Sequence, residues 1–332
     1  MISLSSCSYK CAVCDKPTYS FNYAVLSCNA CKMFFRRCRN LKTPIEPCRT
    51  NGNCGDLVSC CWNENSRNST TPKPASQLTP ILQNLIYLDA DRHQTFSTYL
   101  SMENPGLDDV ILSNSITFIE KTSQMKPDFY DWATMDQISA IIFMKRFSFI
   151  NWLSPSELKS FVKNSYIQFI MLCNAMRSVG LKSDTVGYPD DVDIFPEEIR
   201  QMYTDCSEKL LKIHFMIVAR LIELKITKEE FVLLGAIIIC DPAFDCTEAN
   251  RNRISQYQKI YSSTFLEYCQ HRYQKSGPSR FIDILSICFT INRTFVEFGE
   301  VLMMFDNEAK IKKLFTDFFA FVLNKRESFG IS

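Results

Sequence analysis

The stretch CAVCDKPTYSFNYAVLSCNACKMFFRRCRN, residues 11–40, decides how the N-terminal part of this chain folds. It contains two C-x2-C pairs, Cys11 with Cys14 and Cys28 with Cys31, separated by thirteen residues. Two such pairs supply four thiolates, which form a closed tetrahedral site of the kind that holds structural zinc. Because a closed site leaves no position for water or substrate, we expect this Zn2+ to support the fold and not a reaction.

The residues that follow the second pair predict a basic helix. Residues 28–40 contain neither Gly nor Pro, so a helix can continue from the metal site. Lys32 and Arg36 are four residues apart and therefore share one face of that helix. A zinc-anchored helix with a basic outer face suits the major groove of DNA. The alternative is a zinc knuckle that carries a solvated basic helix.

The same residues resemble a known family. The spacing C-x2-C-x13-C-x2-C followed by KMFFRR resembles the first zinc module of nuclear hormone receptors, and CNACKMFFRR is most similar to the nematode group. The resemblance implies a transcription factor that acts in the nucleus on double-stranded DNA. It implies that Lys32 contacts a base edge, while Arg36 and Arg37 hold phosphates. It also implies that the preference for a DNA half-site is tuned by Asn29, Ala30 and Met33.

A second cysteine group departs from the family pattern. It consists of Cys48, Cys54, Cys60 and Cys61. In the family, a C-x5-C pair is followed nine residues later by a C-x2-C pair, but here Glu64 and Arg67 stand at the two later positions. The adjacent cysteines at 60 and 61 either complete a distorted second zinc site or leave that site incomplete. We therefore expect one Zn2+ and leave the second open.

Charge and cysteine content also separate the two ends of the chain. The 332 residues carry a net charge of +1, but residues 1–60 hold eight Lys and Arg against three Asp and Glu, so the remainder is about −4. Ten of the sixteen cysteines lie in the first 61 residues. Disulfides are the rival explanation for these ten. The polar start lacks a signal peptide, so we expect a reducing compartment and favour metal.

Composition places a boundary between two domains. Residues 63–80 are polar and contain three prolines, which is typical of a linker. We therefore expect a disordered lead over residues 1–10, a zinc DNA-binding module over 11–62, the linker over 63–80 and a helical domain over 81–332. The longest apolar run, Phe231–Cys240, is half of the roughly 20 residues that a membrane span needs, so it predicts a buried helix.

Apolar spacing of three and four residues predicts an all-α, multilayer domain of roughly ten helices after residue 80. Capping boxes mark helix starts at Ser154–Glu157 and at Thr227–Glu230. Residues 184–196 fit short strands or an irregular loop. Pro196 predicts a helix that continues through Phe215, and Gly277-Pro278 predicts a break before a helix from about Arg280.

The helical domain also resembles the nuclear-receptor ligand-binding domain, most clearly over Ile138–Ser178. The pattern Leu314–Phe319 resembles the family's activation helix. The resemblance implies that Asp317 and Lys145 grip the two ends of a co-regulator helix. Acid at a helix N-terminus and lysine at its C-terminus are the charges that a helix favours. The alternative is that both are solvated charges on packed helices.

The remaining features leave two functions open. Twenty-six Phe and twelve Met can line a pocket for a small apolar ligand or can fill the core. The three histidines lie far apart, and no nucleotide-binding or protease motif is present, so we expect no enzyme. The leading hypothesis is a ligand-regulated or orphan receptor that dimerises and does not enter a membrane. The second is a co-regulator-binding or dimerising protein whose degenerate zinc module does not bind DNA.

Overall fold

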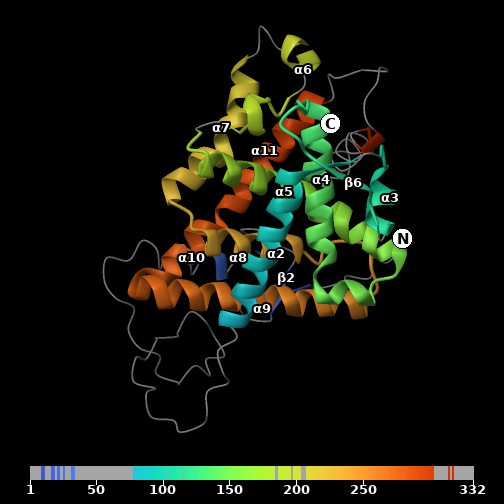
Figure 1. Ribbon diagram of the computed structural model, residues 1–332. Helices are drawn as coiled ribbons and strands as arrows, with labels where there is room; N and C mark the ends of the chain where they lie inside the picture. Colours follow the sequence, from blue (N-terminus) through green and yellow to red (C-terminus); the bar gives the residue numbers. More distant parts are fainter. Residues whose placement is uncertain are drawn as a thin grey trace, which may run out of the picture.

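A computed structural model describes two parts of the chain. In the zinc module it describes residues 9–11, 16–18, 21–22, 25–26 and 31–33. In the rest of the chain it describes residues 78–101, 103–113, 115–183, 186–195, 197–202, 207–302, 313–314 and 316–317. Figure 1 shows the described residues as ribbons.

The helical domain is built of α-helices, as its sequence predicts. From residue 78 on, the described residues form α2 (Leu78–Thr98), α3 (Leu107–Leu112), α4 (Phe129–Lys145), α5 (Pro155–Gly180), α6 (Glu197–Met202), α7 (Ser207–Leu224), α8 (Lys228–Ile239), α9 (Glu248–Tyr273), α10 (Gly277–Leu285) and α11 (Ile287–Leu302). Short 3-10 helices cover Ser148–Trp152, Pro189–Asp191 and Gln274–Ser276. The one described sheet of this domain pairs β5 (Tyr99–Ser101) with β6 (Phe118–Glu120) in antiparallel register.

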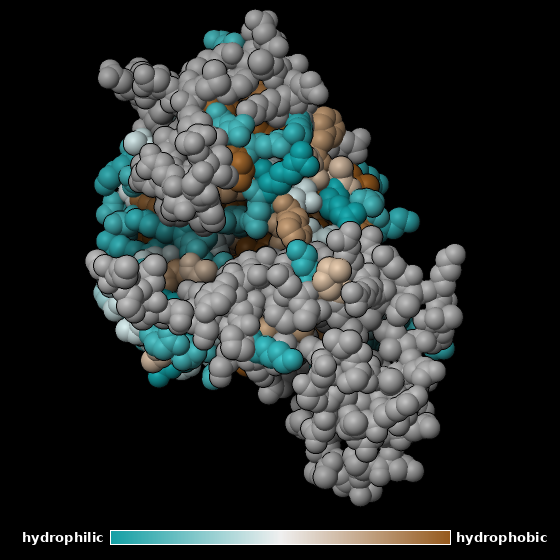
Figure 2. All heavy atoms as spheres, turned by 180° about the vertical axis from the view of Figure 1, so that it is seen from behind, coloured by the Kyte–Doolittle hydropathy of each residue, from teal (hydrophilic) through white to brown (hydrophobic). Residues whose placement is uncertain are grey.

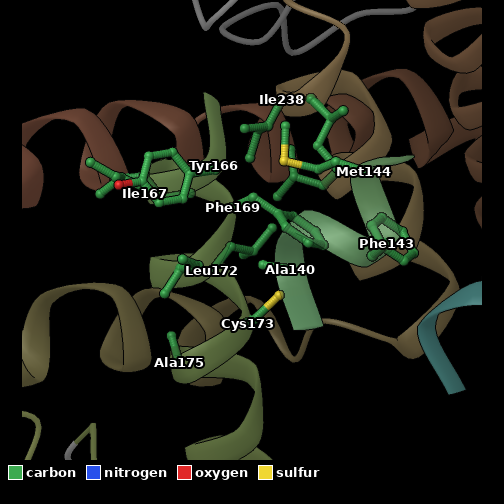
Figure 3. Close-up of a cluster of buried hydrophobic side chains, with 14 of the residues drawn as sticks. Ala140, Phe143, Met144, Tyr166, Ile167, Phe169, Leu172, Cys173, Ala175 and Ile238 are labelled. Atoms are coloured by element: carbon green, nitrogen blue, oxygen red, sulfur yellow. The ribbon is translucent and has the colours of Figure 1, made fainter. Parts of the chain in front are cut away.

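The core of the domain lies where α4, α5 and α8 meet. Figure 3 shows Phe143 and Met144 of α4, Phe169 of α5 and Ile238 of α8 turned toward one another. The rings of Phe143 and Phe169 stack with centroids 5.0 Å apart and planes 15° apart. Around this centre, α2 packs on α4 and α8, and α7 packs on α5 and α11. The long α9 packs on α8 and α10 and runs along the lower edge of the helical domain in Figure 1.

Helix α8 approaches α5 so closely that one position admits no side chain. A Cβ atom at Gly235 would lie 2.9 Å from Cε2 of Phe169. Every residue of α8 from Glu230 to Ile239 is buried. The prediction of a buried helix over Phe231–Cys240 is therefore confirmed, although the helix itself ends at Ile239.

Local hydrogen bonds explain where α5 and α8 begin. The Ser154 hydroxyl accepts the Glu157 N–H at 3.3 Å, and the Glu157 carboxylate accepts the Ser154 N–H at 2.9 Å. Thr227 and Glu230 repeat this exchange at 3.2 and 2.9 Å. Each pair satisfies two backbone donors that a helix start otherwise leaves without partners. Both predicted capping boxes are confirmed.

Buried ion pairs join helices that are distant in sequence. Arg177 of α5 contacts Asp136 of α4 at 2.8 Å, and both side chains are more than nine-tenths buried. Arg280 of α10 contacts the fully buried Glu230 carboxylate of α8 at 2.6 Å. Removing one member of such a pair leaves a buried charge uncompensated, so each pair fixes the relative position of its two helices.

Three predicted boundaries can be compared with the described residues. An isolated antiparallel bridge joins Gly187 and Asp193 inside residues 184–196, where short strands or an irregular loop were expected. The helix expected from Pro196 through Phe215 corresponds to α6 and α7, and residues 203–206 between them lie outside the described residues. Near Gly277 the break falls earlier than predicted. There α9 ends at Tyr273, Gln274 has a φ of 50°, and α10 begins at Gly277.

The later cysteines behave as small apolar residues. Four of them are at most 2% exposed, namely Cys173, Cys240, Cys269 and Cys288. Burial raises the pKa of all four thiols, to about 12 for Cys173, Cys269 and Cys288. A thiol with so high a pKa forms little thiolate at neutral pH and is a poor nucleophile. Cys246 is half-buried, and Cys206 lies outside the described residues.

The described helices do not have the character of membrane spans. None of the helices in the described ranges combines the length and the apolar composition needed to cross a bilayer. On the face shown in Figure 2, the described surface is mostly hydrophilic, and hydrophobic residues appear between the polar ones.

Candidate functional site

Two of the four predicted zinc ligands of the first site are described. Cys11 and Cys31 are 0% and 1% exposed, and their Sγ atoms lie 3.7 Å apart. Two thiolates of a tetrahedral site with Zn–S bonds of about 2.3 Å lie about 3.8 Å apart, whereas disulfide sulfurs lie about 2.05 Å apart. This separation fits shared coordination of one Zn2+ and does not fit a disulfide.

Short hairpins and a helix start position these two sulfurs. Strand β1 (Tyr9–Lys10) pairs with β2 (Pro17–Thr18), and the Cys11 N–H donates to the Lys16 carbonyl at 2.8 Å. This bond continues the pairing of β1 with β2 as far as Cys11. Farther along the chain, β3 (Phe21–Asn22) pairs in antiparallel register with β4 (Val25–Leu26), and the described residues Cys31–Met33 are helical.

The start of the predicted recognition helix is described, and its continuation is not. The side chain of Lys32 is half-buried, and that of Met33 is 40% exposed to solvent. Met33 is therefore accessible for contact with a partner such as DNA. The remaining predicted residues of the zinc and DNA sites lie outside the described residues, namely Cys14, Cys28, Asn29, Ala30, Arg36, Arg37, Cys48, Cys54, Cys60 and Cys61.

In the helical domain, Lys145 is the last residue of α4, and its side chain reaches the C-terminal end of α3. Its Nζ atom donates to the carbonyl of Ser113 at 2.5 Å and to that of Val110 at 3.4 Å. The last carbonyls of a helix have no intrahelical donor, and a lysine there is favoured by the helix dipole. Burial lowers the pKa of Lys145, because desolvation disfavours the ammonium form.

Asp317 lies at the opposite end of the same helix. Its Oδ2 atom accepts the Leu107 N–H at 2.7 Å, and this amide belongs to the first turn of α3. Lys313 is also docked here, because its N–H donates to Asn104 at 2.7 Å and its Nζ contacts Asp109 at 3.1 Å. Figure 1 shows this short red segment beside α3. The structure therefore places Lys145 and Asp317 at the two ends of one short helix of the chain itself.

A glycine makes room for this contact. A Cβ atom at Gly106 would lie 2.8 Å from Oδ2 of Asp317 and 2.9 Å from Cε of Lys313. Neither α3 nor Gly106 was predicted from the sequence to be part of the site. The signal available was the Pro105-Gly106 pair directly before the apolar pattern of Leu107, Val110 and Ile111.

The described residues also line a small, partly open cavity between α4, α5, α7 and α11. Its volume is about 80 Å³. Ile167, Ile170 and Ile213 contribute apolar walls, while Asp136 and Asn174 contribute polar ones. Pockets for drug-sized ligands usually measure about 300–1,000 Å³. This cavity is therefore too small for a ligand of hormone size unless it expands.

Three oxygen atoms make this cavity partly polar. Asp136 Oδ2, Gln137 Oε1 and Asn174 Oδ1 are buried and accept no hydrogen bond from the described residues. Buried acceptors of this kind are normally satisfied by water or by a bound donor. Tyr188 lines this cavity and also a second, open cleft of about 890 Å³. The cleft carries the charged residues Arg177, Asp190 and Asp193, together with His214.

Comparison with known proteins places both parts of the chain in one family. Residues 9–67 match the model of the double treble clef zinc finger of C4 type, and residues 115–306 match that of the ligand-binding domain of nuclear hormone receptors. The chain is 33% identical to nuclear hormone receptor family member nhr-9 of Caenorhabditis elegans over 92% of this chain and 93% of that protein. It is 31% identical to family member nhr-167 of the same organism, over 93% of this chain and 96% of that protein. The chain therefore belongs to the nuclear hormone receptor family of zinc-binding transcription factors, which are not enzymes.

Proposed function

We propose that this chain acts in the nucleus as a sequence-specific DNA-binding transcription factor, and that it recruits co-regulators through the surface between Lys145 and Asp317. The observation that carries the second part is the placement of these two charges at opposite ends of one helix-sized site. The acid accepts a first-turn amide and the lysine donates to last-turn carbonyls. This is the polarity that a helix requires of its two ends.

The DNA-binding part rests on the zinc module. The 3.7 Å separation of the Cys11 and Cys31 sulfurs supports a tetrahedral site directly before the basic helix. Lys32 would contact a base edge, and Arg36 and Arg37 would hold phosphates. Zinc coordination is coupled to the folding of such a small module, so DNA binding should depend on the metal.

A salt titration of DNA binding by the full chain tests this proposal. We expect affinity to fall steeply as salt rises, because each Lys or Arg bound to a phosphate releases counterions. Arg36→Ala with Arg37→Ala should reduce the salt slope by roughly two, about one for each lost phosphate contact. Lys126→Ala, at an exposed position of the helical domain, is the matched control and should leave the slope unchanged.

The zinc content of the same preparation decides between the two candidate functions. Two Zn2+ per chain with salt-dependent DNA binding would support an intact double module. One Zn2+ or fewer, with no binding beyond the non-specific level, would favour a co-regulator-binding protein that does not bind DNA. The observation behind this second candidate is that Glu64 and Arg67 stand where the second C-x2-C pair is expected.

Ligand binding and dimerisation complete the proposal. The cavity of about 80 Å³ supports a domain that keeps its fold without a large ligand. Its unpaired acceptor oxygens favour a ligand that offers hydrogen-bond donors over a purely apolar one. A homo- or heterodimer formed through the helical domain is measurable by sedimentation of the full chain with and without DNA.

A further inference from the structure

The short helix α3 has the residue pattern of a docking helix. Its six residues read LDDVIL. Leu107, Val110 and Ile111 are 2%, 1% and 0% exposed, whereas Leu112 is 42% exposed. Residues spaced i, i+3 and i+4 share one face of a helix, so α3 buries one apolar face and leaves the other open.

The buried face of α3 lies on α4 and α5, and an acidic residue of α3 pairs with two lysines of α5. Helix α3 packs against both of these helices. On the neighbouring side, Asp108 contacts Nζ of Lys159 at 2.7 Å and Nζ of Lys163 at 3.0 Å, and both lysines belong to α5. The hydrogen bond from Lys159 lowers the pKa of the Asp108 carboxyl. The surface under α3 therefore selects an acidic residue directly after the first apolar anchor.

The two ends of α3 use the same groups that would hold an incoming helix. Asp317 accepts the Leu107 N–H, and Lys145 donates to the Ser113 carbonyl. While α3 is docked, these two charges and the apolar surface between them are occupied. A co-regulator helix that needs the same charges cannot bind beside α3 and must replace it.

The length of α3 makes such replacement feasible. Isolated helices shorter than about 12 residues are marginal in water, so six residues stay helical only while they are docked. The ion pairs that hold α3 join exposed or half-exposed side chains, such as Lys313 with Asp109. Exposed pairs of this kind contribute little free energy and weaken in salt.

We propose that α3 occupies the co-regulator surface in cis and competes with an incoming helix. The partner that this surface fits is an amphipathic helix with apolar residues at i, i+3 and i+4 and an acidic residue at i+1. This inference rests on the proposed co-regulator function and adds a regulatory step to it. Binding in trans requires α3 to leave the surface, so the docked fraction of α3 sets the apparent affinity for the partner.

The experiment uses the full chain and a fluorescein-labelled peptide of residues 103–116, which carries the α3 sequence. Fluorescence anisotropy measures how tightly the peptide binds. The variant Leu107→Ala with Ile111→Ala removes two anchors and should release α3 from the surface. Asp108→Lys is a second opening variant, because the new lysine repels Lys159 and Lys163 without removing apolar area. Both should bind the peptide roughly tenfold more tightly than the unaltered chain, as expected when an internal competitor is lost.

Two further variants establish where the peptide binds. Glu103→Lys makes the same charge change as Asp108→Lys at an exposed position that has no ion pair with a described residue, and it should leave affinity unchanged. Adding Lys145→Ala to Asp108→Lys should reverse the gain. Equal affinity of the peptide for the unaltered chain and for both opening variants would overturn the proposal, as would a gain that survives Lys145→Ala. Because no DNA is present, that result would leave the DNA-binding proposal standing.

Discussion

The centre of the helical domain and the α3 edge hold their helices by different means. At the centre, Phe143 and Phe169 stack in a fully buried core, and the Arg177–Asp136 pair is shielded from water. At the edge, three apolar side chains and several exposed charges hold a six-residue helix. Buried contacts contribute to global stability and change little with salt, whereas exposed charge pairs are weak and screened. The centre should therefore resist opening and salt better than the α3 edge.

The largest loss of stability should come from truncating a buried side chain at the centre of the helical domain. Phe169→Ala removes a ring that is 1% exposed and stacked on Phe143. Replacing a buried Phe by Ala typically costs about 3–5 kcal/mol, because transfer free energy is lost and a cavity remains. Urea unfolding of the full chain, followed by circular dichroism at 222 nm, should show this loss. Phe215→Ala, at a side chain that is 39% exposed, is the control. A loss of equal size in both variants would contradict the assignment of the core.

An intermediate effect on stability is expected where the starts of α5 and α9 are joined by hydrogen bonds to Glu157. The Glu157 carboxylate accepts the N–H groups of Thr247 and Ser154 at 2.8 and 2.9 Å, which lowers its pKa from 4.5 to about 2. The ionised form therefore stabilises the fold fully above pH 4.5, and this stabilisation is lost as pH falls from 4.5 toward 2. Solvent screening limits the contribution to about 1 kcal/mol.

Glu157→Gln tests this joint. At pH 7 the variant should unfold at a lower urea concentration than the unaltered chain, and the difference should shrink progressively below pH 4.5. A difference that stays constant between pH 7 and pH 3 would show that the charge of Glu157 does not hold the two helix starts together.

The smallest effect on global stability should come from the α3 edge. The Cβ atom introduced by Gly106→Ala would press on the ends of the Asp317 and Lys313 side chains. Because both ends are flexible, we expect a change below about 0.5 kcal/mol in global stability. Local opening should nevertheless increase, since Asp317 would hold the Leu107 N–H less well.

Hydrogen exchange separates local opening from global opening. In Gly106→Ala the amides of Val110 and Ser113 should exchange faster, while amides of α8 keep their rates. Gly180→Ala is the matched control, because a Cβ atom at that position meets no other atom within 4 Å. Faster exchange in α8 as well as α3 would mean that the edge and the centre open together, and the contrast between the two regions would fail.

Features that depend on near neighbours in sequence were predictable. The capping boxes at Ser154–Glu157 and Thr227–Glu230 form from residues three apart, and the structure confirms both. The C-x2-C spacing identified the zinc module, because two thiolates from one turn can reach one metal ion. The helix break near Gly277 was predicted too late in the sequence. The positive φ of 50° falls on Gln274, and glutamine, unlike Gly or Pro, does not mark a helix break in a sequence.

Features that depend on distant segments were only partly predictable. Resemblance to the family singled out Lys145 and Asp317, but nothing in the sequence placed them at the ends of α3. The Arg280–Glu230 and Arg177–Asp136 pairs likewise join helices far apart along the chain. Their partners were not readable, because any buried arginine can pair with any carboxylate that the fold brings near it.

The sequence by itself determined the family, the presence of a zinc module and the helical class of the second domain. These follow from residue spacing, which fixes local geometry directly. Only the tertiary structure decided that the ligand-binding domain keeps a cavity of about 80 Å³ and that α3 lies between Lys145 and Asp317. Cavity volume depends on how all the core side chains pack together, and a docked helix depends on contacts between segments separated by most of the domain.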